Sequence, residues 1–357
     1  MNLDDLDLIH KLDAQNMLGE IDHLPTQLEK AWELGQHQDV GHASSGTYER
    51  VLISGMGGSA IGADLVAAYA SAACRLPVIV HRDYGLPAWA RGAETLVIAS
   101  SHSGDTEETL DSFETALKNK CRLLAICTGG ELEKRADAAG VPVWKFAHAG
   151  QPRAAVGYSF GLLLSAFARF GLIDTPEKVT TEVVTTVTAM KKQQESLRAE
   201  APVARNPAKR MAGQLVGRWV NVYASGLLAP VARRWKGQVN EHAKAGAGFE
   251  VLPEADHNAL AGTMNPSDTL SHTFNLFLRA ASDHPRNRLR ADLTRRALML
   301  EGLSTDFYDA QGDSPLAQMW TTVHFGDYTA FYLAIAYGVD PTPVEALQNF
   351  KAEMKVG

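Results

Sequence analysis

The stretch that decides the fold runs Leu96-Val97-Ile98-Ala99-Ser100-Ser101-His102-Ser103-Gly104-Asp105-Thr106-Glu107-Glu108-Thr109. Its first residues are apolar and predict a buried strand, a loop of small polar residues follows, and a helical pattern begins after the loop. Ser101, Ser103 and Thr106 bring hydroxyl groups and backbone N–H groups to the start of that helix. A helix N-terminus favours an anion, and phosphate oxygens accept several hydrogen bonds at once. The loop therefore predicts a site for a phosphorylated small molecule.

An earlier unit of the same kind runs Val51-Leu52-Ile53-Ser54-Gly55-Met56-Gly57-Gly58-Ser59-Ala60-Ile61-Gly62-Ala63-Asp64. Its glycines match the dinucleotide fingerprint G-x-G-x-x-A, and Asp83 follows the next predicted strand, where a ribose-binding acid would lie. The run Gly57-Gly58-Ser59 instead suits a smaller anion or a sugar hydroxyl. Two structural alternatives stay open, because the glycines could serve only a tight turn and the serine-rich loop could only cap a helix.

The bulk composition bounds the class of protein. A chain of 357 residues is too long for one typical core and suits two domains. The formal charge of -7, with no basic run, argues against nucleic acid and anionic membranes as partners. No run of about 18 uncharged apolar residues is present, so we expect no membrane span. The odd number of cysteines, three, without a CxxC motif predicts buried thiols, and with no signal-peptide pattern it predicts a cytoplasmic protein.

Strand and helix patterns alternate along most of the chain, which predicts an α/β fold with parallel sheets flanked by helices. We expect a helical segment over residues 1–45, a first α/β domain with both loops over 46–173, and a helical linker over 174–210. A second domain, a weaker copy of the first with C-terminal helices, is expected over 211–357. Within it, alternating hydrophobic residues predict a strand over Asp268–Phe277.

These loops resemble the sugar isomerase (SIS) domain family, which binds phosphosugars. Gly57-Gly58-Ser59 and Ser101-x-Ser103-Gly104-x-Thr106 carry the resemblance. Within the family the chain looks most like the bifunctional glucose-6-phosphate/mannose-6-phosphate isomerases. The further matching segments are Leu24-Pro25-x-Gln27, Gln151-Pro152-Arg153-Ala154-Ala155, Asn240-Glu241-x-Ala243-Lys244, Pro253-Glu254-x-x-His257-Asn258, and Asp340-Pro341-Thr342-Pro343-Val344 with Lys351. The resemblance implies two SIS domains, each an αβα sandwich, in a homodimer whose active sites are shared between subunits.

The resemblance also implies an activity: interconversion of glucose 6-phosphate or mannose 6-phosphate with fructose 6-phosphate through a cis-enediolate. Glu241 would move the proton between C1 and C2, and His257, from the neighbouring subunit, would open the sugar ring. Arg153 would stabilise the enediolate oxygen, and Lys351 would assist ring opening. The implied substrate-binding residues are Gly57, Gly58, Ser59, Ser101, Ser103 and Thr106. Without the resemblance, the four catalytic candidates read as exposed or structural side chains.

No metal and no cofactor are expected. The histidines near Glu241 lack the spacing of metal ligands; they are His242, His257, His272 and His284. The chain departs from the family at two positions, with His242 where the family often has Asn and Ala259 where it often has Glu. These changes would alter the surroundings of Glu241 and His257. Thr342 is a candidate for the wall of the roomier pocket that a mannose substrate would need.

Other functions stay open. The chain could bind a phosphosugar without turnover, or isomerise another phosphorylated sugar. A DNA-binding sensor is disfavoured because residues 1–45 hold no basic recognition helix. An amino-sugar synthase would need an N-terminal Cys nucleophile, but Asn2 stands there and the first cysteine is Cys74. A nicotinamide dehydrogenase also stays open, because the first loop taken alone matches the dinucleotide fingerprint.

Overall fold

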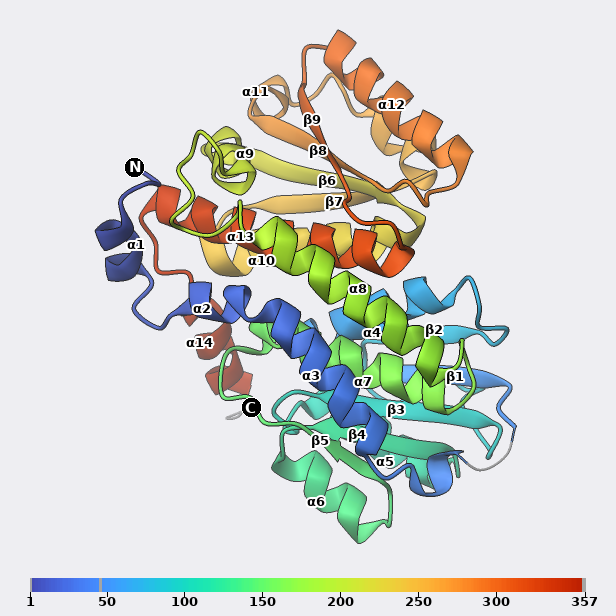
Figure 1. Ribbon diagram of the computed structural model, residues 1–357. Helices are drawn as coiled ribbons and strands as arrows, with labels where there is room; N and C mark the ends of the chain where they lie inside the picture. The colour runs from blue at the N-terminus through green and yellow to red at the C-terminus, as the bar shows by residue number, and fades with distance from the viewer. Residues whose placement is uncertain (1, 45–46, 355–357) are drawn as a thin grey trace. The chain divides into compact units, whose positions relative to one another are not determined.

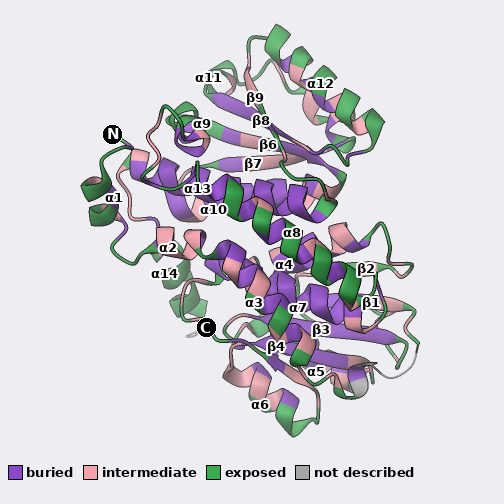
Figure 2. Cartoon of the chain, in the orientation of Figure 1, coloured by how far each residue is buried: buried purple, intermediate pink, exposed green. Residues whose placement is uncertain are grey.

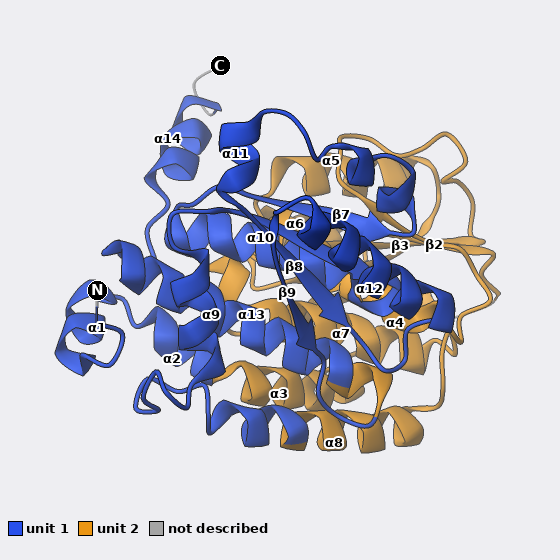
Figure 3. Cartoon of the chain, turned by 90° about the horizontal axis from the view of Figure 1, so that it is seen from above, with its two compact units in different colours: residues 1–22, 189–313, 318–357 blue, residues 23–188, 314–317 orange. Residues whose placement is uncertain are grey.

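The computed structural model describes residues 2–44 and 47–354. The chain divides into two compact units (Figure 3), of which unit 2 holds the described part of residues 23–188 together with 314–317, and unit 1 holds the rest. The predicted boundary at residues 45 and 46 lies outside the described residues, and so does the end of the second predicted domain, residues 355–357.

Unit 2 is built on a parallel sheet, as the alternating pattern predicted. Its strands are β1 (Arg50–Ser54), β2 (Val78–His81), β3 (Thr95–Ser101), β4 (Arg122–Cys127) and β5 (Val143–Lys145). Within the described residues the order is β2-β1-β3-β4-β5, and every neighbouring pair is parallel. The connections leave β1 and β3 in opposite directions, so the carboxyl ends of these two strands form a topological switch point. Such a topological switch point is where open α/β sheets bind ligands.

Helices cover both faces of this sheet. The helices of unit 2 are α3 (Leu24–His37), α4 (Gly57–Ala70), α5 (Glu107–Lys118), α6 (Gly130–Ala138), α7 (Val156–Arg169) and α8 (Pro176–Gln194) as far as Thr188, with the 3-10 turns η1 (Gly41–Ser44) and η2 (Pro152–Ala154). Helices α5 and α6 pack on one face around Phe113 and Leu132, while α4 and α7 cover the other and α3 lies against α7 (Figure 1). Because both faces are covered, β3 is buried over its whole length (Figure 2).

Unit 1 contains a second parallel sheet. Its strands are β6 (Trp219–Ser225), β7 (Ala247–Leu252), β8 (Thr273–Arg279) and β9 (Ser304–Asp309), in the order β7-β6-β8-β9 within the described chain. The predicted strand over Asp268–Phe277 is wrong in its first half, because Ser267–Ser271 forms helix α11 and β8 begins at Thr273. Pro266 precedes this helix and Asp268 lies in its first turn, a local start signal that outweighs the alternation.

Helices of unit 1 pack against this second sheet, α10 (Ala229–Ala243) on β6 and β7 and α12 (Pro285–Leu300) on β8 and β9. The unit also contains α1 (Leu6–Leu12), α2 (Met17–Asp22), α9 (Pro207–Leu215), α13 (Pro315–Tyr337) and α14 (Glu345–Met354), with the 3-10 turns η3 (Gly226–Leu228), η4 (Glu254–His257) and η5 (Ala259–Ala261). Helix α13, whose residues as far as Ala317 belong to unit 2, is buried from Leu316 to Ile335. Most of these residues are apolar, but His324 and Asp327 are buried with them. Across residues 2–44 and 47–354, no helix combines the length and apolar character needed to span a membrane.

Candidate functional site

The loop after β3 draws its hydroxyl groups into one turn. Ser101 Oγ lies 2.8 Å from Thr106 Oγ1 and accepts a hydrogen bond from the Gly104 N–H at 3.1 Å. Ser103 Oγ accepts a hydrogen bond from the Asp105 N–H at 3.2 Å. Thr106 is the N-cap of α5, so the turn leads directly into the positive end of that helix. The structure thus brings three predicted phosphate ligands together at the switch point.

The loop after β1 joins the same cluster. Ser59, in the first turn of α4, accepts a hydrogen bond on Oγ from the His102 N–H at 3.2 Å. Gly57 adopts φ +51°, a left-handed conformation that glycine reaches at little cost. At Gly58 a Cβ would lie 2.5 Å from the carbonyl oxygen of Pro152, so only glycine lets the loop approach that backbone. The helix N-termini of α4 and α5 therefore lie at one crevice.

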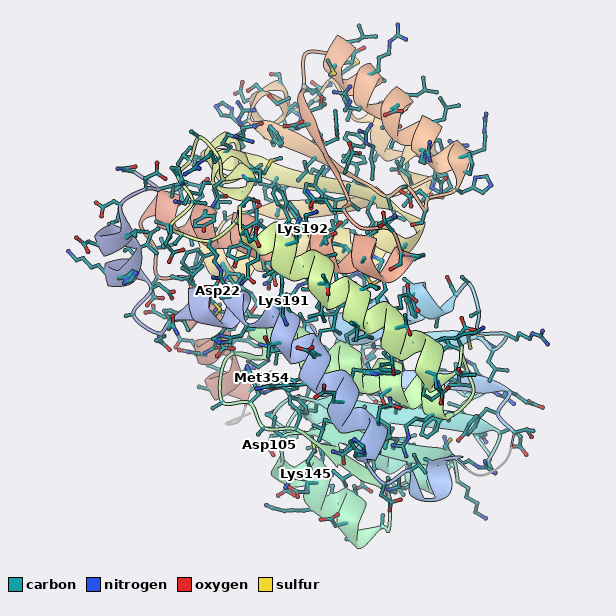
Figure 4. The ribbon with its side chains drawn as sticks, in the orientation of Figure 1. Asp22, Asp105, Lys145, Lys191, Lys192 and Met354 are labelled. Carbon is teal, nitrogen blue, oxygen red and sulfur yellow. The ribbon has the colours of Figure 1, made fainter. Side chains whose placement is uncertain are left out.

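A third loop, which the sequence interpretation missed, closes the cluster from the side of β4. Gly104 has φ +76°, and a Cβ there would lie 1.8 Å from the carbonyl oxygen of Gly129. Gly130 is equally constrained, because its Cβ would lie 2.4 Å from the Ser103 carbonyl oxygen. Asp105, labelled in Figure 4, accepts the Glu131 N–H at 2.9 Å and so ties this loop to α6. The Gly129-Gly130 pair directly after a predicted strand was the available signal.

Arg153 is a buried cation whose backbone lies next to the β1 loop. It lies on η2, between β5 and α7, and is only 5% exposed. Its Nη1 donates to Gln151 Oε1 at 3.4 Å, and the adjoining Pro152 carbonyl packs against Gly58. The backbone that carries this buried guanidinium therefore lies against the β1 loop, and a guanidinium favours an anionic ligand.

The histidine of the loop adds no charge at neutral pH. Burial, together with the charge of the neighbouring His148, lowers the pKa of His102 to about 4. At pH 7 the imidazole of His102 is therefore neutral. The N-termini of α4 and α5 carry partial positive charge at the loops that hold the hydroxyls.

Glu241 lies in unit 1, in the last turn of α10, where its side chain is half-buried. The end of this helix is fixed on both sides of the glutamate. Asn240 Nδ2 donates to the Ala245 carbonyl at 2.8 Å. Lys244 ends the helix with φ 53°, and its Nζ donates to the carbonyl oxygens of His242 at 3.1 Å and Asp340 at 2.6 Å. The backbone that carries Glu241 is thus held in one conformation.

A buried polar network backs this turn. The two Nε2 atoms of Gln238 and His242 lie 3.1 Å apart, and Gln238 Nε2 donates to Asp327 Oδ1 at 2.9 Å. Arg234 pairs with both Asp327 oxygens, at 3.1 and 2.6 Å. His242, flagged as a departure from the family, is fully buried and belongs to this network. No local motif marks the network, because Asp327 comes from α13.

His257 and Lys351 are both exposed. His257 ends the turn η4, which the neighbouring Asp256 anchors to α12 through Arg290 at 2.7 Å and Thr294 at 2.6 Å. Lys351 lies on α14, a helix with an exposed surface (Figure 2). The structure describes these two side chains in unit 1 and the hydroxyl cluster in unit 2.

Two further positions named by the sequence also have a defined setting. Thr342 is buried, and its N–H donates to Asp340 Oδ1 at 2.8 Å. Ala259 is the first residue of the 3-10 turn η5, and its N–H donates to Oδ1 of Asn258, the N-cap residue, at 2.5 Å. In the described part of the chain, no three His, Cys, Asp or Glu side chains gather in a way that could hold a metal ion.

Known proteins resemble this chain in sequence and in fold. Residues 204–354 match the family model "Bacterial phospho-glucose isomerase C-terminal SIS domain". A bifunctional phosphoglucose/phosphomannose isomerase of Caldicellulosiruptor bescii is 39% identical over 345 residues, which cover 95% of this chain and 100% of the relative. One from Aquifex aeolicus is 32% identical, covering 86% and 91%. Among solved structures, a hypothetical protein of Thermus thermophilus superimposes with a TM-score of 0.72 at 17% identity, covering 98% of this chain and 93% of the other, which shows a common fold.

Proposed function

Because this chain belongs to the family of bifunctional phosphoglucose/phosphomannose isomerases, we propose that it interconverts glucose 6-phosphate or mannose 6-phosphate with fructose 6-phosphate. The chain is an isomerase of phosphosugars. The observation that carries the choice of substrate is the cluster of Ser59, Ser101, Ser103 and Thr106 at the β1–β3 switch point. Hydroxyls, backbone N–H groups and the buried Arg153 suit a phosphate monoester, whose oxygens accept several hydrogen bonds.

In the proposed reaction Glu241 is the base. Its carboxylate removes the proton from C2 of the open-chain aldose, the electron pair forms the C1–C2 double bond, and the carbonyl oxygen at C1 becomes the enediolate oxygen. The hydroxyl proton of O2 passes to O1, and Glu241 returns its proton to C1, which gives the ketose with its carbonyl group at C2. In the enediolate C2 is planar, so glucose and mannose 6-phosphate reach the same intermediate. The fixed end of α10 supports this role, since proton transfer needs a carboxylate held in place.

Two kinds of group would assist. Arg153 stabilises the enediolate oxygen by charge and hydrogen bonding. His257 and Lys351 open the sugar ring, His257 by acid–base catalysis and Lys351 by contacting the sugar oxygens. We propose that His257 acts in the active site of a second copy of the chain. Its exposed position on the anchored turn η4 supports this assignment. The functional protein would then be a homodimer with shared sites.

We further propose that the enzyme works in the cytoplasm without metal or cofactor. All three cysteines are free thiols, and burial raises the pKa of Cys127 to about 11, which keeps this thiol protonated and unreactive. The proton transfers assigned to Glu241 and His257 need no electron acceptor.

The test is a coupled assay for fructose 6-phosphate in the presence of EDTA, with glucose 6-phosphate and mannose 6-phosphate supplied separately. Turnover of both sugars is the expected result. Turnover of neither by folded protein would overturn the proposal. If both phosphosugars then still raised the melting temperature, the chain would be a phosphosugar-binding protein without turnover.

A further inference from the structure

A pair of histidines lies behind the phosphate loop and has no part in the chemistry described above. His102 stands between Ser101 and Ser103, but its ring packs against the segment that follows β5. Its Nε2 lies 2.9 Å from Nδ1 of His148. The two rings meet edge to face, with centroids 5.1 Å apart. The loop that carries the hydroxyls is therefore linked by a side chain to a part of the chain that holds none of the predicted phosphate ligands.

The backbone of His102 is where three loops of the crevice meet. Its N–H donates to Ser59 Oγ at 3.2 Å, which joins the β1 loop to the β3 loop. Its carbonyl oxygen accepts from Thr128 N at 3.0 Å and from Thr128 Oγ1 at 2.7 Å, which adds the loop after β4. A displacement of this residue would move Ser101 and Ser103 directly, and would change the hydrogen bond to Ser59.

The ring of His102 is held in place on more than one side. Phe146 contacts it edge to face at a centroid distance of 5.8 Å. Phe146 in turn stacks on Tyr158 of α7 at 5.2 Å, and Tyr158 lies 5.8 Å from His148. Because burial keeps His102 neutral at pH 7, its bond to His148 needs one ring nitrogen as donor and the other as acceptor. This bond and the packing against Phe146, which stacks on Tyr158, together hold the ring of His102 in place.

We propose that His148 is a positioning residue for phosphosugar binding, which holds the β3 loop in its binding shape through the ring of His102. The inference rests on the proposed phosphate role of that loop. The bond acts on the phosphate end of the substrate, whereas the proton moves between C1 and C2. Losing it should therefore weaken binding of substrate and transition state alike, which raises KM more than it lowers kcat.

Two substitutions separate the hydrogen bond from the packing of the ring. His148→Phe keeps an aromatic ring against Tyr158 and removes the bond to His102. His148→Asn removes the ring, but its amide can reach the position of Nδ1 and restore the bond. A lost hydrogen bond that leaves a partly buried partner unsatisfied corresponds to about a tenfold change in affinity. We expect the Kd for glucose 6-phosphate and the KM to rise about tenfold in His148→Phe and about twofold in His148→Asn.

The measurements are calorimetric titration with glucose 6-phosphate and with inorganic phosphate, followed by steady-state kinetics. His37→Leu is the matched control, because His37 is an exposed histidine of the same unit at the end of α3. This variant should bind and turn over like the unmodified protein. In a double-mutant cycle, His102→Phe with His148→Phe should bind no more weakly than either single variant, since both remove one bond.

The outcomes separate this inference from the proposed function. If the unmodified protein binds neither glucose 6-phosphate nor inorganic phosphate, the proposed phosphate site is wrong. If it binds both and His148→Phe binds them equally well, the positioning role is wrong. It is also wrong if His148→Asn loses as much affinity as His148→Phe. Should His148→Phe fail to fold, His102→Phe removes the same bond from the other side, and an unchanged Kd there would overturn the proposal.

Discussion

Single residues in this chain act through the backbone that carries them. Gly104 has φ +76° and lies against the Gly129 carbonyl, while its N–H donates to Ser101 Oγ within the same turn. Lys244, with φ 53°, ends α10 directly after the turn that carries Glu241. In both places one residue in a left-handed conformation shapes the backbone next to a proposed catalytic or binding side chain.

The role of Glu241 can be tested with an isosteric change. Glutamine keeps the size and hydrogen-bonding capacity of the side chain but cannot accept the C2 proton. We expect Glu241→Gln to lower kcat by about 10²–10⁴-fold in the coupled assay, the usual contribution of a general base. The Kd for glucose 6-phosphate in calorimetry should stay nearly the same. Glu301→Gln, at an exposed glutamate, is the control. An unchanged kcat in Glu241→Gln would show that another group moves the proton.

At the scale of the element, the two sheets share a switch-point topology but differ in what they hold there. The β1–β3 crevice carries hydroxyls and helix N-termini. At the equivalent place after β6 and β8 stands Asp283, which is buried and accepts the Ala280 N–H at 2.9 Å. Burial raises the pKa of Asp283, although the hydrogen bonds it accepts oppose this shift. A carboxyl group at this position does not attract a phosphate dianion, and it already accepts the Ala280 N–H. We therefore propose that phosphate binds to unit 2.

The ion pair between α10 and α13 should matter far more than a similar pair at the surface. Arg234 and Asp327 pair through two hydrogen bonds and are 3% and 4% exposed. Removing one partner leaves a buried charge uncompensated. We expect Asp327→Asn to lower the free energy of unfolding by about 3–5 kcal/mol in urea denaturation. It should also lower kcat, because Gln238 and His242 lose their anchor beneath Glu241.

A matched control exists within the same unit. Arg279 also pairs with both oxygens of Asp309, at 2.8 and 2.9 Å, but Asp309 is 61% exposed. Water and salt screen this pair, so Asp309→Asn should cost less than about 1 kcal/mol. Equal costs for the two substitutions would mean that burial does not determine the strength of the Arg234–Asp327 pair.

At the scale of the whole molecule, a shared active site makes a prediction for mixed dimers. Glu241→Gln and His257→Ala should each be inactive alone. If Glu241 and His257 of one site come from different subunits, a mixed dimer has one site with both defects and one intact site. Coexpressing the two variants in equal amounts should restore about a quarter of the activity of the unmodified protein. No recovery, with mixed dimers demonstrated by differential tagging, would place both residues in one subunit.

The pH dependence of stability follows from a histidine buried in a neutral form. Burial lowers the pKa of His324 to about 4, and its Nε2–H donates to the Ile21 carbonyl oxygen at 2.9 Å. In the unfolded chain the pKa of the same group is near the usual histidine value of 6.5. The unfolded state therefore binds more protons between these values, so this contribution is complete above pH 6.5 and is lost as the pH falls towards 4.

The size of the effect can be measured by urea denaturation at pH 7 and pH 5. The contribution of His324 should fall by ~2 kcal/mol over this interval. His324→Gln keeps an N–H donor for Ile21 but does not titrate. Between pH 7 and pH 5 its free energy of unfolding should therefore fall by ~2 kcal/mol less than that of the unmodified protein. His37→Leu removes an exposed histidine and should show the full decrease. Parallel decreases in His324→Gln and the unmodified protein would show that other groups cause the acid sensitivity.

The sequence by itself determined the parts that depend on neighbours along the chain. Alternating strand and helix patterns determined the parallel α/β architecture, because apolar runs without charge must be covered on both faces. The cluster of hydroxyls in the serine-rich loop could be predicted for the same reason, since Ser101 and Thr106 meet within one turn. The segment Asp268–Phe277 marks the limit of this approach, because a short helix after a proline shares its apolar spacing with a strand.

Only the tertiary structure decided which distant side chains meet. His102 and His148 are 46 positions apart, and Arg234 and Asp327 are 93 apart. Such pairs depend on strand order, on register and on the packing of helices over the sheet, which are set by many weak contacts acting together and leave no local pattern. The chemistry-bearing loops could therefore be recognised from their residues, while the contacts that hold them in shape became visible only in the fold.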